Sequence, residues 1–391
     1  MKVCIISHFG YPLYNEDSSL QFGGGSEVQL YLLSKEFIKN INVEVNVITG
    51  DYGGNNDHTE KLDKIKLYKI LPLKRNFFNY FKFLFNLSFY LIKINPDIVI
   101  QRSVSVTTGL TAAYCLLFRK KFIYSIANKT DVDSSKKGLI FKIFRFGLKH
   151  ADYVIAQNNE QMDLLKKIKL NNPSQALVLK SGYPIRKSEI EITNKSDILW
   201  VGRAVNWKRP ELFLKLALIF KNHNFKMICT KYVDQQYWEN LKNLTESIPN
   251  LKFFEFVKFS EIKDYFKKAK VYINTSIYEG FPNTFLQAFR YKTPVISLNV
   301  NPDNIFEEYN LGYYCNDNFE LLKEKLSELI QNSALQEMIG RNAYSYVSKF
   351  HDIEIIGKQW IKVINFILNK KEKPVKTLSN TKLFSNLYKL T

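Results

Sequence analysis

The sequence is poor in acidic residues and in cysteine. Its 391 residues hold 37 Asp and Glu against 56 Lys and Arg, a formal net charge of +19 at pH 7. Such a balance favours anionic partners, namely nucleotide phosphates, an acidic membrane surface or nucleic acid, although a solvated lysine-rich surface gives the same charge. The four cysteines lie far apart and form no Cys-x-x-Cys pair. The sequence therefore indicates neither a zinc site nor a disulfide framework.

Several other signals are missing. The five histidines show no metal-ligand spacing, and no glycine-rich loop ends in the Gly-Lys-Ser/Thr of a P-loop. Residues 1–6 form an apolar run that turns polar at once, which predicts a strand rather than a signal peptide. The most aromatic stretch, 77–92, is interrupted by Lys82 and Asn86, whereas a membrane-spanning helix needs roughly 20 apolar residues. We therefore expect a cytoplasmic protein.

What is present is an alternation of short apolar strands and amphipathic helices. With 46% hydrophobic residues, the chain is long enough for two domains, each with its own core. We expect strands at 3–7, 43–49, 97–100, 122–126, 152–157, 197–203, 225–229, 251–257, 271–275, 294–298 and 309–315. This order predicts an α/β fold of two doubly wound, Rossmann-like domains with parallel sheets.

The domain limits follow from composition. We place the first domain at 1–184, with the strand at 152–157 as its last, and a polar linker at 185–196. The second domain then covers 197–351, and an amphipathic helix follows at 352–370. The tail, 371–391, is basic with spaced apolar residues; it is either a short interfacial helix or a frayed end, and the frayed end is favoured.

The strongest pattern lies at 278–297. The strand expected at 271–275 is followed by Glu279, a tight turn at 280–282, and a helix that Asn283 or Thr284 would cap. N–H groups in the first turn of that helix would form an anion site beside the Glu279 carboxylate. Such a pocket suits sugar hydroxyls and a phosphate, and the Gln287 amide is close enough along the helix to reach it.

This run resembles the Glu-x7-Glu signature of family 4 of the glycosyltransferases, retaining enzymes of the two-domain GT-B fold. The resemblance implies that Glu279 contacts the donor sugar and that the two domains face each other across a cleft. It also implies that Gln287, in the place of the second glutamate, contacts the ribose without its charge. The other donor-site residues that it implies are Phe259, beside the nucleobase, and Phe281, Pro282, Asn283 and Thr284.

A second pattern lies upstream. The strand expected at 197–203 ends in Arg203, and Lys208 precedes a helix. A forked guanidinium and a point charge suit a diphosphate, although in isolation the pair would indicate two surface cations. The arrangement also resembles the diphosphate-binding residues of the same family. Arg203, Lys208 and Glu279 are therefore the predicted catalytic residues.

The first domain gives weaker signals. Three glycines at 23–25 precede a helix that Ser26 and Gln29 would start as a capping box. Glycines before a helix let the backbone come close to a ligand. In the resembled family, a Gly-Gly loop in this position, here Gly24 and Gly25, approaches the donor phosphates and the acceptor.

On the acceptor side we expect Asn128 and Asp131, which follow the strand at 122–126. Many of the resembled enzymes carry a histidine there, and none is present, so the acceptor chemistry does not carry over. Asp131 and Asp133 also spell the Asp-x-Asp pattern that holds a metal in the GT-A fold. Nothing else in the sequence supports that fold.

The stretch 77–92 has a wide apolar helical face, with Lys74 and Arg75 at its start. It is either a core helix or a helix that dips into a membrane interface. Together with the +19 charge and the basic tail, this stretch predicts peripheral attachment to the anionic inner face of a membrane.

The sequence thus predicts a glycosyltransferase, independent of metals and cofactors, that retains anomeric configuration. It would move a sugar from a nucleotide-diphosphate sugar to a glycan or lipid-linked acceptor in cell-surface polysaccharide synthesis. A nucleotide-sugar epimerase and a non-catalytic relative are alternatives with the same fold; Gln287 and the missing histidine suggest the second. A nucleic-acid-binding protein would explain the charge, but no recognised binding motif is present, so no nucleic-acid partner is expected.

Overall fold

The computed structural model describes residues 1–15, 20, 23–53, 58–73, 77–132, 137–168, 175–185 and 195–368, with the side chains of 77–81 excepted. These residues fall into two compact units. Unit 1 comprises the described residues within Met1–Glu16, Phe22–Lys180 and Ile355–Thr391, and unit 2 those within Asp17–Gln21 and Ser181–Glu354. Most of the expected linker, the tail, Lys74, Arg75 and Asp133 lie outside the described residues. No helix in the described ranges is long and apolar enough to cross a membrane.

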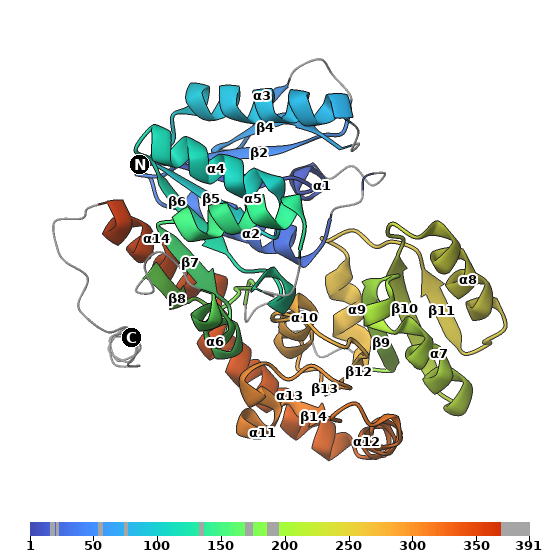
Figure 1. Ribbon diagram of the computed structural model, residues 1–391. Helices are drawn as coiled ribbons and strands as arrows, with labels where there is room; N and C mark the ends of the chain where they lie inside the picture. The colour runs from blue at the N-terminus through green and yellow to red at the C-terminus, as the bar shows by residue number, and fades with distance from the viewer. Residues whose placement is uncertain are drawn as a thin grey trace. The chain divides into compact units, whose positions relative to one another are not determined.

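Unit 1 is built on an eight-stranded sheet of order β3-β4-β2-β1-β5-β6-β7-β8 (Figure 1). The strands are β1 (Lys2–Ser7), β2 (Glu44–Asp51), β3 (Thr59–Leu62), β4 (Ile65–Pro72), β5 (Ile98–Arg102), β6 (Lys121–Ser125), β7 (Tyr153–Ala156) and β8 (Ala176–Val178). All neighbouring pairs are parallel except β3 with β4, which is antiparallel. The central strands are apolar and almost fully buried, as expected for a sheet covered on both faces.

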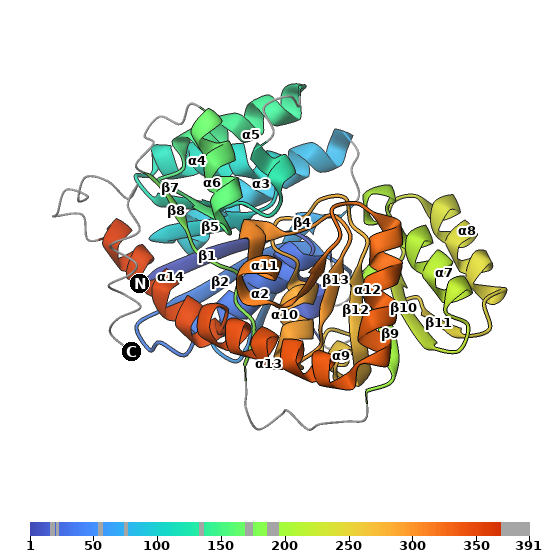
Figure 2. The same ribbon diagram turned by 90° about the horizontal axis from the view of Figure 1, so that it is seen from below.

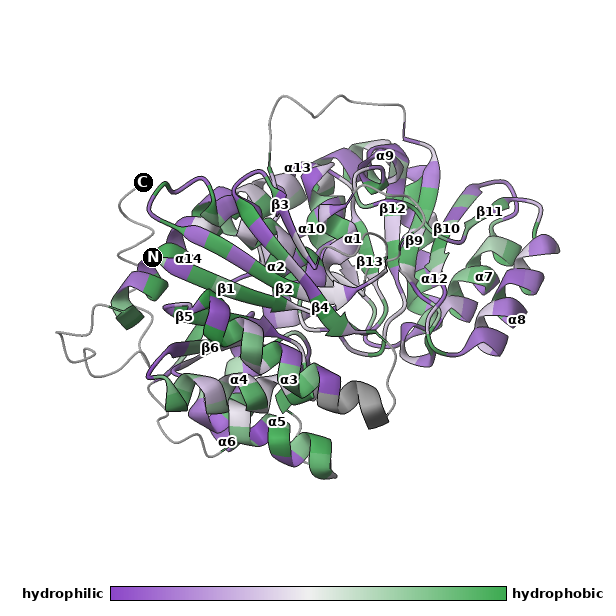
Figure 3. Ribbon diagram, turned by 90° about the horizontal axis from the view of Figure 1, so that it is seen from above, coloured by the Kyte–Doolittle hydropathy of each residue, from purple (hydrophilic) through white to green (hydrophobic). Residues whose placement is uncertain are grey.

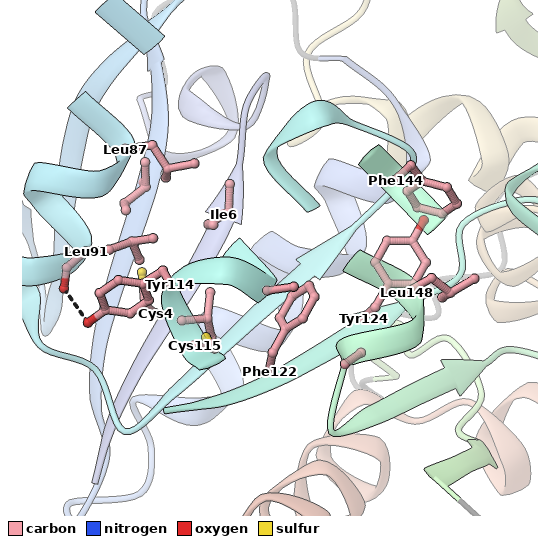
Figure 4. Packing of buried hydrophobic residues seen from close by; sticks show 14 of the residues in the cluster. Cys4, Ile6, Leu87, Leu91, Tyr114, Cys115, Phe122, Tyr124, Phe144 and Leu148 are labelled. Carbon is pink, nitrogen blue, oxygen red and sulfur yellow. Dashed lines mark hydrogen bonds between the residues drawn. The ribbon is translucent and has the colours of Figure 1, made fainter. Parts of the chain in front are cut away.

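Helices cover both faces of this sheet. They are α1 (Tyr11–Tyr14), α2 (Gly25–Phe37), α3 (Phe77–Ile94), α4 (Val106–Leu117), α5 (Leu139–His150), α6 (Asn159–Lys167) and α14 (Ile353–Leu368), with a 3-10 turn, η1 (Lys129–Val132). α3, α4 and α5 pack residues such as Leu87, Tyr114 and Phe144 onto Ile6 and Phe122 of the strands (Figure 4). α2 and α14 pack against each other, with the Phe37 and Trp360 rings 6.5 Å apart between centroids.

Unit 2 holds a six-stranded parallel sheet of order β11-β10-β9-β12-β13-β14 (Figure 2). Its strands are β9 (Asp197–Arg203), β10 (Asn224–Thr230), β11 (Leu251–Phe254), β12 (Ala269–Asn274), β13 (Val295–Ser297) and β14 (Gly312–Tyr314). Its helices are η4 (Asn206–Lys208), α7 (Pro210–Ile219), α8 (Gln235–Glu246), α9 (Ile262–Lys268), α10 (Asn283–Arg290), η5 (Pro302–Asn304), α11 (Ile305–Tyr309), α12 (Phe319–Gln331) and α13 (Ser333–Phe350). The strand order reverses between β9 and β12, and ligands of doubly wound sheets bind at the carboxyl ends of strands beside such a point.

The predicted fold class, two doubly wound α/β domains, is confirmed, but three predicted details are wrong. The first sheet is not wholly parallel, because β3 is an antiparallel edge strand. The strand at 152–157 is not the last of its domain, since β8 follows at the edge. The strand expected at 309–315 shrinks to Gly312–Tyr314, because Tyr309 ends α11 and Asn310 takes a left-handed φ of 50°.

The expected side-chain caps are also absent. α2 begins at Gly25 with Gly24 as its N-cap and no side-chain cap, and the Ser26 hydroxyl donates instead to the Glu27 carboxylate at 2.6 Å. α10 begins after Pro282, with no side-chain cap from Asn283 or Thr284. A cap residue needs extended backbone just before the helix, and these residues already lie within the first turn.

Candidate functional site

The carboxyl ends of β9 and β12 are joined through Thr275, the fully buried residue that follows β12. Its hydroxyl donates to the Lys208 carbonyl at 2.5 Å and accepts from the Trp200 indole N–H, on β9, at 2.9 Å. Its carbonyl accepts from Nε of Arg209 at 2.8 Å. Arg209 has a left-handed backbone, φ 49°, at the corner between η4 and α7. These bonds fix η4, which carries Lys208, against the end of β12.

The site is centred on an ion pair between Lys208 and Glu279. Nζ of Lys208 contacts Oε1 of Glu279, and the two side chains are only 18% and 15% exposed. The Ser276 hydroxyl donates to the same carboxylate oxygen at 3.0 Å. The fold thus brings together two predicted site residues that are 71 positions apart. A phosphate that binds Lys208 has to share this cation with Glu279 or replace the carboxylate.

The N-terminus of α10 lies three residues beyond Glu279. Pro282 is the N-cap residue, and no side chain caps the helix. The Thr284 hydroxyl is engaged with the buried Tyr272 hydroxyl instead. The N-cap residue Pro282 thus supplies no side-chain hydrogen bond to the positive end of the helix dipole. A helix N-terminus of this kind favours a phosphate, with Asn283 and Thr284 half-buried in the first turn.

The connection from Glu279 to α10 is anchored by the fully buried His351. The Phe281 ring packs on the imidazole with the centroids 4.6 Å apart. Nδ1 of His351 is hydrogen-bonded to the Ser181 carbonyl at 2.7 Å, and Nε2 contacts the Tyr346 hydroxyl at 3.2 Å. Phe281 and Pro282 are both buried, so they shape the loop that presents Glu279.

Gln287 lies on the inner side of α10 and is 5% exposed. Its amide Nε2 donates to the Tyr183 hydroxyl at 3.3 Å. The Tyr183 ring also meets the Phe259 ring edge-on, 6.4 Å between centroids, and the Arg290 guanidinium lies 5.7 Å from its centre. Two predicted donor-site residues, Phe259 and Gln287, therefore meet at one tyrosine that the sequence did not single out.

Arg203, at the end of β9, lies over the Tyr232 ring, with its guanidinium carbon 4.4 Å from the ring centroid. This cation–π contact holds the side chain beside the loop that follows β10. The ion pair of Lys208 and Glu279 does not include Arg203.

In unit 1, Gly24 and Gly25 form the start of α2. Gly23, just before them, donates its N–H to the Phe9 carbonyl at 3.2 Å. A Cβ at Gly23 would lie 2.7 Å from the Cβ of Phe9, so only glycine allows this approach of the loop to the end of β1.

Asp131 is a buried carboxylate of unit 1 that organises the loop after β6. It accepts hydrogen bonds from the Tyr124 hydroxyl at 3.0 Å and from the Ala127 N–H at 2.7 Å. Burial raises the pKa of Asp131, although these bonds and the charge of Arg102 oppose the rise. In the same way, burial disfavours the charged form of Arg102 and lowers the pKa of its guanidinium to about 10. Asn128 lies in the same loop, and its buried Oδ1 has no hydrogen-bond partner in the described structure.

The Asp-x-Asp interpretation has no geometric support in the described part of the chain. Asp133 lies outside it. Among the residues that are described, no three His, Cys, Asp or Glu side chains gather so as to hold a metal ion.

Four residues of these sites were missed by sequence reasoning: Thr275, Tyr183, His351 and Arg102. A threonine after a strand or a tyrosine before a linker carries no pattern of its own. Arg102 ends an apolar strand, as Arg203 does, and that parallel could have drawn attention to it.

Two family models match the chain. The model described as "Glycosyltransferase Family 4" matches residues 23–179, and the one described as "Glycosyl transferases group 1" matches 184–346. Among curated proteins, the chain is 24% identical to the uncharacterised glycosyltransferase MJ1069 of Methanocaldococcus jannaschii, over 88% of this chain and 96% of that protein. It is 22% identical to the amylovoran biosynthesis glycosyltransferase AmsD of Erwinia amylovora, over 72% of this chain and 81% of that protein. It spans only 50% of a matching uncharacterised glycosyltransferase from Haemophilus influenzae.

Solved structures share the fold at low identity. Sucrose-phosphate synthase of Thermosynechococcus elongatus superposes with a TM-score of 0.76 at 15% identity, covering 94% of this chain and 99% of that one. HepE of Anabaena, solved with UDP and glucose, superposes with a TM-score of 0.72 at 14% identity, covering 93% and 99%.

Proposed function

The chain belongs to the family 4 glycosyltransferases and is a glycosyltransferase of the GT-B fold, and we propose that it transfers a sugar, with retention of anomeric configuration, from a nucleoside-diphosphate sugar to a glycan or lipid-linked acceptor. The Lys208–Glu279 pair at the ends of β9 and β12 carries the proposal. It combines a cation for phosphate with a carboxylate for sugar hydroxyls, beside an uncapped helix N-terminus.

In the proposed reaction the bond between the anomeric carbon and the diphosphate breaks, and its electron pair stays with the diphosphate. Lys208, Arg203 and the N-terminus of α10 stabilise the charge that develops there. Glu279 orients the sugar hydroxyls, and Gln287 holds the ribose. The acceptor hydroxyl gives its proton to the departing diphosphate oxygen and bonds to the anomeric carbon on the same face. Fixed cations and backbone dipoles replace a metal ion in this scheme.

Known relatives support the substrate classes. HepE of Anabaena was solved with UDP-glucose, and a mutant of TarM of S. aureus with Fondaparinux, alpha-GlcNAc-glycerol and UDP. AmsD is named for amylovoran biosynthesis. These names favour a uridine-diphosphate sugar as donor and cell-surface polysaccharide synthesis as the setting. The net charge of +19 further favours a cytoplasmic chain that meets its acceptor at an anionic membrane surface.

Incubation of the full chain with a panel of nucleotide sugars, with and without lipid-linked acceptor, tests the proposal. Release of nucleoside diphosphate together with a glycosylated acceptor is the expected result. Conversion of the sugar without acceptor would instead identify an epimerase. Binding of donor without any turnover, in the presence of every acceptor, would identify a non-catalytic relative.

A further inference from the structure

The outer helices of unit 1 expose an unusual amount of apolar surface. Nine of the eighteen exposed large apolar side chains among the described residues lie on α3, on α5 and at the carboxyl end of α4. This apolar face consists of Phe85, Phe89, Ile92, Leu116, Leu117, Phe118, Leu139, Ile140 and Phe146. Leu117 is 77% exposed, and Phe85 and Leu139 are each 72% exposed. Figure 3 shows the hydrophobic colouring on these three helices. Large exposed apolar patches mark interaction sites rather than ordinary surface.

An open groove of about 670 Å³ runs between the same helices. Leu84 of α3, Leu110 of α4, and Ile143 and Phe146 of α5 line it, and Lys142 is the charged side chain at its rim. At the floor of the groove, the backbones of α4 and α5 are in close contact at Gly109. A Cβ at Gly109 would lie 2.6 Å from the Ile143 carbonyl oxygen. The groove is therefore apolar, open to the surface and built by helix backbones in direct contact.

The charges on this layer have one sign. The sequences of α3, α4 and α5 contain no Asp or Glu, whereas they carry Lys82, Lys93, Lys142, Arg145 and Lys149. Lys142 and Lys149 are exposed on α5, the helix that also carries Leu139 and Phe146. Apolar side chains interleaved with cations are typical of a helix that lies in a membrane interface. A symmetric contact with a second copy would place these cations against each other, which opposes self-association through this face.

We propose that the α3–α4–α5 layer of unit 1 docks on an anionic lipid leaflet, and that the groove between the helices takes one hydrocarbon chain of an anionic lipid. The lysines then meet the lipid phosphates, and the apolar face enters the acyl boundary. The proposal rests on the proposed function only in that a lipid-linked acceptor would be met at the same surface; binding itself needs no turnover.

Co-sedimentation of the full chain with vesicles tests the docking. We expect binding to phosphatidylcholine vesicles that contain phosphatidylserine, much weaker binding to phosphatidylcholine alone, and weakening as salt rises. Lys142→Glu and Lys149→Glu should each lower the partition coefficient about fivefold or more, and Leu139→Glu should lower it as well. The matched controls lie in unit 2: Lys252→Glu, and Val233→Glu at a side chain that is 84% exposed. Both should bind like the unmodified chain.

The groove is tested with a phosphatidylserine that carries a photoreactive diazirine near the end of one acyl chain. Crosslinks in peptides that contain 106–110 and 139–146 are expected. Equal binding to neutral and anionic vesicles, equal loss in the control variants, or crosslinks confined to other segments would overturn the proposal. The proposal is also overturned if the chain binds no vesicle and instead forms a dimer in sedimentation velocity that Leu139→Glu dissociates.

Nucleoside-diphosphate binding, measured for every variant, separates the two proposals. Variants that keep this binding and also keep the far-UV circular dichroism and the melting temperature of the unmodified chain are folded in both units, so a loss of vesicle binding then reports the docking face. Vesicle binding in a chain that turns over no nucleotide sugar would refute the proposed function and leave the docking intact. Turnover of nucleotide sugar without vesicle binding would refute the docking and leave the proposed function intact.

Discussion

At the scale of single residues, the central feature of the candidate site is the ion pair between Lys208 and Glu279. A shielded ion pair is costly to break by removing one member, because the other is left uncompensated. Under the proposed function, the donor replaces both partners: its diphosphate binds the lysine, and its sugar hydroxyls bind the carboxylate.

Lys208→Ala and Arg203→Ala should each weaken the binding of free nucleoside diphosphate by about 1.5–3 kcal/mol, because each removes a charge-assisted contact. Isothermal titration calorimetry measures the change. Lys252→Ala, an exposed lysine on β11, is the control and should bind normally. Unchanged affinity in both site variants would place the phosphate elsewhere.

Glu279→Gln should separate binding from transfer. The amide keeps the shape but releases Lys208 from its ion pair, so nucleoside-diphosphate affinity should hold or rise. Transfer should fall at least tenfold, about 1.4 kcal/mol of transition-state stabilisation, because the sugar loses its charged hydrogen-bond acceptor. Calorimetry and a transfer assay on the same preparation check this. A parallel fall in affinity would show that Glu279 serves the phosphate site.

Gln287→Glu should be tolerated. A carboxylate at this position accepts from the Tyr183 hydroxyl where the amide now donates to it, and Arg290 lies against the same ring. Transfer rates should stay within about threefold of the unmodified chain, whereas Gln287→Leu, which leaves the buried Tyr183 hydroxyl without this partner, should be impaired. A collapse of donor affinity in Gln287→Glu would mean that the pocket requires a neutral group.

At the scale of elements, the loop between β6 and α5 depends on the buried Asp131. Because burial raises the pKa of Asp131 above its usual 3.8, the folded state binds this proton more tightly than the unfolded state. Stability from this group is therefore lost as the pH rises. Relative to Asp131→Asn, the unmodified chain should lose free energy of unfolding between about pH 4 and pH 7. Urea unfolding at both pH values measures the difference, and a constant difference would contradict the raised pKa.

The elements also show what sequence patterns capture. The apolar strands of both sheets and the helix at 283–290 follow from their apolar runs and from the turn at 280–282, so the fold class was predictable. β4 was not among the expected strands, and its lysines, Lys66 and Lys69, interrupt the apolar run. Lys69 in β4 is nevertheless buried, since it pairs with Glu60 at 3.4 Å and lies over the Tyr11 ring. Glu60 meets Lys69 only because β3 pairs with β4, and Tyr11 lies far from Lys69 in the sequence, so a local pattern contains neither contact.

The same reason limits prediction of the site. Glu279, Lys208 and Gln287 belong to motifs with fixed spacing, so sequence alone named them. Thr275 and His351 act by joining segments that are far apart, the first through bonds to Lys208 and Trp200, the second through bonds to Ser181 and Tyr346. Such residues become visible only when the strands are assembled.

At the scale of the whole molecule, the positive charge bears on metal dependence. Under the proposed function, a chain with a net charge of +19 and a lysine in the ion pair of the site supplies its own cations for the leaving diphosphate. Transfer should therefore persist in EDTA at an unchanged rate. The control is a metal-dependent transferase in the same buffer. Loss of activity in EDTA that manganese restores would point to carboxylate ligands, with Asp131 and Asp133 the first to test.

The edge strands of both sheets are short, and this limits how other chains can pair with them at high local concentration. The strands at the sheet edges have three or four residues, β3, β8, β11 and β14, whereas the interior strands β2 and β9 have eight and seven. Unpaired edges are templates on which other chains can add strands, and short edges offer few such bonds. A chain that gathers on a surface can therefore crowd there without seeding aggregates through its sheets.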